Sequence, residues 1–246
     1  VKNTTDETTA LNNLYNTLLQ QGNLPLGNYG EEFFNKQTSE IKKILENKEA
    51  SLLTILKKWD KATSEPATLD IENFTVNGAI KVLPREFDNA AAVTEPDFRY
   101  SSDKTSDRLA CWLRLLFATA CGYNRDIIYH RKNKKTLIFT GPDNADIAKD
   151  FLRNLVKIYS DNFDQIAPFI PNVSCAYYKA LQESPGNRAE ALDKAKQLWL
   201  KPGYNGKADK DDPYYFTAFG EDGPTSLDRF TDIAQTVFSQ HFELTK

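Results

Sequence analysis

The sequence predicts an α/β fold in which a mixed sheet is flanked by helices. One stretch alternates apolar and polar residues around a short polar turn, which is typical of half-buried strands paired as a hairpin, and two short apolar runs that flank a polar turn predict a second hairpin. The first lies between Thr68 and Leu83 with its turn at Glu72 and Asn73, and the second pairs residues 126–131 with residues 136–140. Between them, residues 106–120 carry apolar side chains at helical spacing.

The elements around the first hairpin follow from the same periodicities. Leu69 and Ile71 share one parity on its first strand, and the second strand carries Phe74, Val76, Ile80 and Val82. Residues 97–100 form a short third strand. In the helix that follows, Trp112 lies on the apolar face, so we expect it in the core.

Helices are predicted on both sides of these strands. We place them at residues 11–19, 31–45, 52–59, 147–159, 172–183, 188–200 and 230–238. Asp143 is suited to capping the helix of residues 147–159, and Asn187 with Glu190 resembles a capping box. Lys201–Gly223, rich in Gly, Asp and Pro, is predicted to be a long ordered loop.

Composition excludes several classes of protein. A net charge of −3 gives no overall attraction to nucleic acid or anionic membrane, and no run approaches the ~18 apolar residues of a membrane span. Three cysteines in apolar stretches indicate reduced thiols, so we expect a cytoplasmic protein. The chain starts at Val1 and has no methionine, so we interpret it as a fragment of a longer protein.

The motifs of the common catalytic and metal sites are missing from the sequence. There are two histidines, and no CxxC, HExxH, Walker-type loop or GxSxG elbow. The short segment at residues 203–207 is interpreted as a turn. We therefore expect no metal site and no cofactor.

Three short motifs, with the order of the elements, carry a resemblance to a known family. They are Leu24-Pro25-Leu26-Gly27-Asn28-Tyr29-Gly30-Glu31, Asn77-Gly78-Ala79-Ile80 and Cys111-Trp112-Leu113. They resemble the C-terminal domain of RecC, the gamma chain of exodeoxyribonuclease V, from the helix at residue 11 to the end of the chain. The resemblance implies a restriction-endonuclease-like nuclease core that has lost its active site.

The residues at two strand positions explain why the active site is expected to be lost. Active relatives carry Gly-x-x-Asp on one strand and Asp-x-Lys on another, because Mg²⁺ prefers carboxylate oxygens. Here the first motif ends in Lys81, and the second has Asp97 but places Arg99 where the lysine is required. A cation at the first position repels the metal, and arginine does not readily lose a proton. We therefore expect no catalytic residues, with Lys81, Asp97 and Arg99 as degenerate positions.

Two groups of residues are candidates for binding. Arg131, Lys132, Lys134 and Lys135 at the tip of the second hairpin are candidates for contacting DNA phosphates, although such a charge run is more often simply solvated. Tyr214, Tyr215, Phe216 and Phe219 are candidate anchors for a partner protein, with packing onto the body of the domain slightly favoured.

The resemblance implies one domain over residues 1–246, with a helical leader at 1–63, a nuclease-like core at 64–160 and C-terminal helices at 161–246. Its implied function is non-catalytic: strand separation, strand guidance and subunit docking in a helicase-nuclease that processes DNA ends for recombination repair. The implied partners are RecB-like and RecD-like subunits and DNA ends, without a membrane. Two alternatives stay open: a nuclease that uses Asp97 with Asp70 or Glu72, and a pure protein-interaction module.

Overall fold

The computed structural model describes residues 2–47, 56, 58–84, 93–99, 104–131, 136–201 and 208–243. It divides into two compact units, Val1–Leu56 and Lys57–Lys246. Among the described residues, no helix has the length and apolar character needed to cross a membrane.

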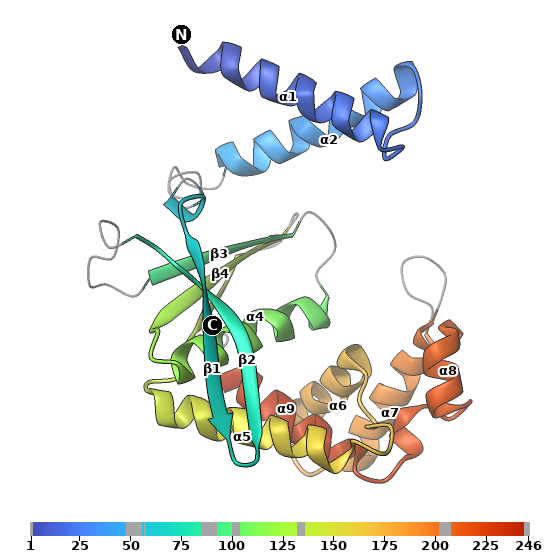
Figure 1. The fold of residues 1–246 in the computed structure, drawn as a ribbon. Helices are drawn as coiled ribbons and strands as arrows, with labels where there is room; N and C mark the ends of the chain where they lie inside the picture. The colour runs from blue at the N-terminus through green and yellow to red at the C-terminus, as the bar shows by residue number, and fades with distance from the viewer. Residues whose placement is uncertain are drawn as a thin grey trace. The chain divides into compact units, whose positions relative to one another are not determined.

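The first unit contains α1 (Lys2–Gln20) and α2 (Asn28–Asn47), as the sequence predicted (Figure 1). A tight connection joins them: Leu24 is buried, and a Cβ at Gly30 would lie 1.8 Å from the Pro25 carbonyl oxygen. The Tyr15 and Phe34 rings meet edge to face, with centroids 5.3 Å apart. Most of the helix predicted at residues 52–59 lies outside the described residues.

In the second unit, β1 (Thr63–Ile71) and β2 (Phe74–Val82) form the predicted antiparallel hairpin. Its two-residue turn is closed by the pairing of Ile71 with Phe74. Gly78 on β2 faces the Phe117 ring, where an added Cβ would lie 2.7 Å from the nearest ring carbon. Close packing against this ring therefore explains the glycine.

A separate three-stranded sheet has the order β3–β4–β5. Here β3 (Val93–Arg99) runs parallel to β4 (Arg125–Arg131), and β5 (Leu137–Thr140) pairs antiparallel with β4, with Ile127 opposite Phe139. The predicted second hairpin and the mixed character of this sheet are confirmed. The third strand, predicted at residues 97–100, starts earlier, at Val93, and it pairs with β4 across a helical connection, as parallel strands require.

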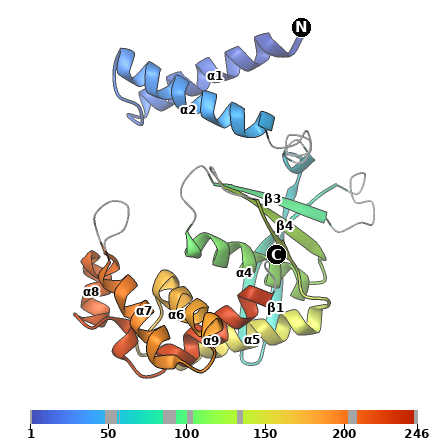
Figure 2. The ribbon, with the colours of Figure 1, turned by 180° about the vertical axis from the view of Figure 1, so that it is seen from behind.

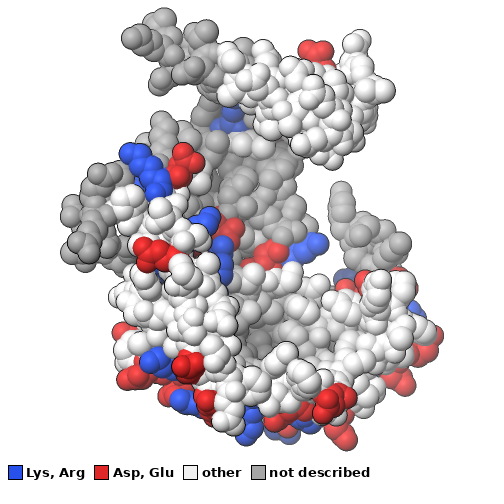
Figure 3. All heavy atoms as spheres, viewed as in Figure 1, with Lys and Arg blue, Asp and Glu red and all other residues white. Residues whose placement is uncertain are grey.

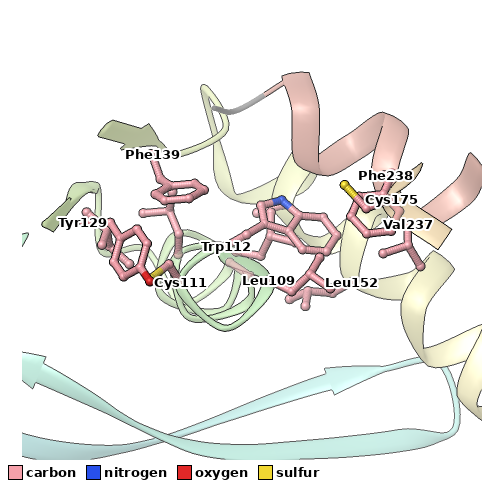
Figure 4. Close-up of a cluster of buried hydrophobic side chains, with 14 of the residues drawn as sticks. Leu109, Cys111, Trp112, Tyr129, Phe139, Leu152, Cys175, Val237 and Phe238 are labelled. Carbon is pink, nitrogen blue, oxygen red and sulfur yellow. The ribbon is translucent and has the colours of Figure 1, made fainter. Parts of the chain in front are cut away.

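The helix between β3 and β4, α4 (Thr105–Ala120), is the centre of the main core (Figure 4). Trp112, Leu115 and Leu116 on α4 are at most 1% exposed. Tyr129 and Phe139 reach this core from the sheet, and Leu152 reaches it from α5 (Ala145–Asp161). The expectation that Trp112 is a core residue is confirmed.

The remaining helices gather at the end of the second unit away from the three-stranded sheet (Figures 1 and 2). They are α6 (Pro171–Glu183), α7 (Arg188–Leu200), α8 (Pro213–Phe219) and α9 (Phe230–Glu243), with one-turn 3₁₀ helices η2 (Asp209–Asp211) and η3 (Pro224–Ser226). A second core cluster centres on Trp199, Tyr177 and Phe230.

Two local predictions in this region need correction. The stretch predicted to be a long loop contains α8, because the Asp212 carboxylate accepts from two backbone amides and Pro213 occupies the first turn. The N-cap of α5 is Asn144, one residue beyond Asp143. The cap at Asn187 is confirmed, since its side-chain oxygen accepts from the Glu190 amide.

Candidate functional site

Two carboxylates of β3 face the same side of the three-stranded sheet. Glu95 and Asp97 are two positions apart, so their side chains share one face. On β4, Arg125 has the same parity as Ile127 and Tyr129, which are buried in the main core. The strand period thus brings acidic and basic side chains onto the face of the sheet that packs against the core.

The most buried contact joins Glu95 and Arg125. Arg125 Nη1 donates to Glu95 Oε2 at 3.1 Å, and the two side chains are 10% and 5% exposed. The same nitrogen donates to the Lys81 carbonyl oxygen at 2.9 Å, which ties β2 to β4. The guanidinium also lies 5.9 Å from the Trp59 ring centroid and 5.6 Å from that of Tyr123. Arg125 therefore connects both sheets through charge, hydrogen bonding and aromatic contacts.

A second arginine, Arg114 of α4, covers the two carboxylates from the helix side. It forms an ion pair with Asp97, and its Nη1 lies 3.6 Å from Glu95 Oε1. Burial disfavours the charged guanidinium, but the nearby Asp97 and Glu95 carboxylates outweigh burial and raise the pKa of Arg114. Arg114 is therefore held in its charged form between two anions.

A thiol completes the group. Cys111 Sγ donates to Asp97 Oδ2 at 3.4 Å, and the residue is 1% exposed. Burial, with the neighbouring Asp97 carboxylate, raises the pKa of Cys111 to about 12. The thiol stays protonated at neutral pH, so it acts as a hydrogen-bond donor and not as a nucleophile.

We call Glu95, Asp97, Cys111, Arg114 and Arg125 the Glu95 cluster. Both of its carboxylates are engaged by guanidinium groups, so each negative charge already has a cationic partner. A divalent cation there would have to displace or oppose two arginines. Elsewhere too, no three His, Cys, Asp or Glu side chains of the described residues are grouped so that they could hold a metal ion.

The predicted degenerate positions have different surroundings. Asp97 is part of the Glu95 cluster, whereas the Lys81 side chain is exposed and only its carbonyl oxygen contacts the cluster. Arg99 ends β3, and its side chain lies outside the described residues. Sequence reasoning missed Glu95, Arg114 and Arg125. One signal was available: Arg125 has the parity of the apolar residues on its strand, which predicts a buried charge in need of a partner.

The alternative nuclease site is not assembled in this fold. Asp70 lies one residue before the end of β1 and accepts from Thr75, and Glu72 at the hairpin turn lies 3.6 Å from Arg153. The cluster contacts the other end of the hairpin, at Lys81, nine residues from Glu72. At about 3.3 Å per residue, this separation is roughly 30 Å for Glu72, and it is roughly 20 Å for Asp70, which lies opposite Thr75, so neither joins Asp97.

Of the two groups of candidate binding residues, the structure describes the side chains of only one. Lys132, Lys134 and Lys135 lie outside the described residues, as does the side chain of Arg131. Of the four aromatics on α8, Tyr214 and Phe216 are 86% and 43% exposed, whereas Tyr215 is half-buried and Phe219 is 8% exposed. The ring of Phe219 meets that of Trp199 edge to face, at 6.5 Å between centroids.

Comparison with protein-family models gives a match that covers residues 3–182, more than half of the chain. The matching family is described as the RecC C-terminal domain. The chain belongs to this family. A search of curated proteins found no match. RecC is the gamma subunit of exodeoxyribonuclease V, and the family resemblance read from the short sequence motifs is confirmed.

The Glu95 cluster, the hairpin and α4 all lie within the part of the chain that matches the RecC C-terminal domain. Residues 183–246, with α7, α8 and α9, lie beyond the matched range. The candidate anchors on α8 therefore lie outside the matched range.

Proposed function

We propose that this RecC-type domain is a non-catalytic, architectural part of an exodeoxyribonuclease V complex. In this role it helps to separate and guide the DNA strands at a double-strand end, and it docks a RecD-like subunit. The motors and the nuclease reside on other chains of the complex. Family membership supports the setting, and the charges of the Glu95 cluster support the absence of catalysis.

The single observation that carries the proposal is the engagement of Glu95 and Asp97 by two arginines. Metal-dependent nucleases need carboxylate oxygens that are free to bind Mg²⁺. Here Arg114 occupies the space between the two carboxylates, and Arg125 holds Glu95 from β4. The cluster stabilises the junction of β2, β3, β4 and α4, which is a structural task and not a chemical one.

The order of elements supports descent from a restriction-endonuclease-like core. A β-hairpin, a third strand, a crossover helix and a parallel strand follow one another as β1, β2, β3, α4 and β4. In this interpretation, the Glu95 cluster occupies the former active site. The ion pairs replace the metal as the neutralising charge, and they keep the strands and the helix in place.

Two surfaces are proposed to serve the complex. Tyr214 and Phe216 on α8 are suited to anchor a partner, because they expose aromatic rings beside the acidic residues Asp211 and Asp212. Acidic side chains are visible along this edge of the unit in Figure 3. The hairpin tip with Arg131, Lys132, Lys134 and Lys135 is proposed to contact DNA phosphates. These tasks require binding only.

A nuclease assay tests the proposal. The purified chain is incubated with linear duplex and single-stranded DNA, with Mg²⁺ or Mn²⁺. We expect no metal-dependent cleavage by the parent chain or by the Asp97→Ala variant. Metal-dependent cleavage that Asp97→Ala abolishes, and that the exposed control Asp164→Ala retains, would overturn the proposal in favour of an active nuclease.

A further inference from the structure

The outer face of the α6 and α7 pair is hollowed. A loop of four residues joins the two helices, which lie side by side in both ribbon views (Figures 1 and 2). Two adjoining hollows of about 330 and 270 Å³ share four lining residues, Ala176, Lys179, Leu198 and Lys201. Together they form what we call the α6/α7 groove.

The groove is long enough for a short helix. Along α6, its lining runs from Asn172 to Glu183, which is about 16 Å at 1.5 Å per residue. This length corresponds to three helical turns. Neither the partner-docking aromatics of α8 nor the Glu95 cluster contributes a side chain to this lining.

The floor of the groove is apolar, and its α6 side is made of small side chains. Ala176 and Ala180 are one helical turn apart on α6, and Leu198 faces them from α7. Small side chains one helical turn apart leave depressions between the larger side chains around them. A second helix presents apolar residues at the same one-turn spacing, so its side chains can fill these depressions. Because alanine side chains are small, Ala176 and Ala180 leave the hollow open.

The rim is mainly basic. Lys179, Lys194 and Lys201 line the smaller hollow with Glu183 as its one carboxylate, and the larger hollow adds Asp209 at its other end. Cations therefore outnumber anions around an apolar floor. The groove is complementary to a ligand that combines an apolar stripe with negative charge.

We propose that the α6/α7 groove binds an acidic amphipathic helix of a partner protein. Two apolar side chains of that helix, one turn apart, occupy the floor at Ala176 and Ala180. Its flanking Glu or Asp residues face Lys179, Lys194 and Lys201. This inference does not depend on the DNA-processing role proposed above.

Nucleic acid is the less suitable occupant, although lysines also attract phosphate. Single-stranded nucleic acid is usually bound by aromatic platforms that stack the bases, together with cations that follow the backbone. The groove is lined by no aromatic side chain and no arginine among the described residues. Its apolar floor cannot form ion pairs or hydrogen bonds with a phosphate backbone.

The test uses the full chain and a designed probe. The probe is a fluorescently labelled, helix-stabilised peptide with two leucines one turn apart and flanking glutamates. Two matched peptides serve as controls: one has lysine in place of every glutamate, and the other has asparagine in place of the leucines. Binding is measured by fluorescence anisotropy, and we expect the first peptide to bind and both control peptides to bind at least about tenfold more weakly.

Chain variants locate the binding. The double variant Lys194→Glu with Lys201→Glu reverses the charge of two rim lysines, and Ala180→Glu places a carboxylate on the floor. We expect each variant to weaken probe binding about tenfold or more, because charge complementarity or the apolar contact is lost. Lys36→Glu with Lys157→Glu makes the same change in net charge at exposed positions outside the groove, and it should leave the affinity nearly unchanged.

Three outcomes would overturn the inference. The first is no binding of the acidic peptide at millimolar concentration. The second is equal binding by the groove variants and the control variant. The third is a single-stranded oligonucleotide that displaces the peptide and requires the same lysines, because the groove would then be a nucleic-acid site.

Discussion

Glu95 and Arg125 form an ion pair between the parallel strands β3 and β4, with 3.1 Å between Oε2 and Nη1. The contact is almost closed to solvent, since the two side chains are 10% and 5% exposed. The same arginine nitrogen reaches the Lys81 carbonyl oxygen. One buried charge pair therefore links the three-stranded sheet to the hairpin.

Removing one partner of this pair should destabilise the domain strongly. Glu95→Ala leaves the buried Arg125 guanidinium without its anion, which typically costs about 3–5 kcal/mol. We expect a loss of this size in the free energy of unfolding, measured by urea denaturation. Arg153→Ala is the control, because its exposed pairs with Glu72 and Asp150 each contribute at most about 1 kcal/mol. Equal losses in the two variants would contradict a structural role for the cluster.

The raised pKa of Cys111 predicts a dependence of stability on alkaline pH. Burial and Asp97 raise the pKa of this thiol from an ordinary value of 9.0 to about 12. Between these values the unfolded chain releases a proton that the folded chain keeps. Stability is therefore fully present below pH 9 and falls as the pH rises, by up to about 1.4 kcal/mol per pH unit.

The Cys111→Ser variant isolates this effect, because serine does not titrate in the range. Other groups also ionise there, so the quantity to compare is the difference between parent and variant in the free energy of unfolding. We expect that difference to shift in favour of the variant as the pH is raised from about 8 to about 11. A difference that stays constant would show that the Cys111 thiol ionises equally in both states.

The aromatic residues of α8 should fall into two groups, exposed anchors for a partner and buried core residues. Tyr214→Ala with Phe216→Ala removes exposed rings, so we expect normal thermal stability and weaker co-purification with the RecD-like subunit. Phe219→Ala removes a buried ring that packs on Trp199 and should cost about 3–5 kcal/mol of stability. Unchanged co-purification of the folded double variant would exclude α8 as a docking element.

The basic hairpin tip should carry a salt-dependent share of DNA binding. The strands β4 and β5, which flank this tip, pair with each other. Changing Lys132, Lys134 and Lys135 to Ala should weaken binding of DNA ends by the assembled complex, most at low salt and without regard to base sequence. Each lost phosphate contact should lower the log–log salt slope by about 0.7–0.9. Thermal stability should be nearly unchanged, and unchanged DNA binding at every salt concentration would leave the tip as a solvated turn.

Local patterns in the sequence determined most of the secondary structure. Period-two alternation predicted the β1–β2 hairpin with its turn at Glu72 and Asn73, and two apolar runs around a polar turn predicted the pairing of β4 with β5. Helical spacing predicted α4, and the Asn187 side chain predicted the start of α7. These features depend on residues within a few positions of one another, so a single sequence contains the information.

Only the tertiary structure decided which elements meet. The pairing of β3 with β4 joins segments that α4 separates, and the strand pattern does not specify a partner at that distance. The Glu95 cluster likewise draws its five residues from two strands and a helix, so no local motif contains it. Through the family resemblance, the sequence predicted a degenerate Mg²⁺ motif at Lys81, Asp97 and Arg99. The fold added the physical reason for the stability of the Glu95 cluster, because Arg114 and Arg125 neutralise the carboxylates that burial would otherwise make costly.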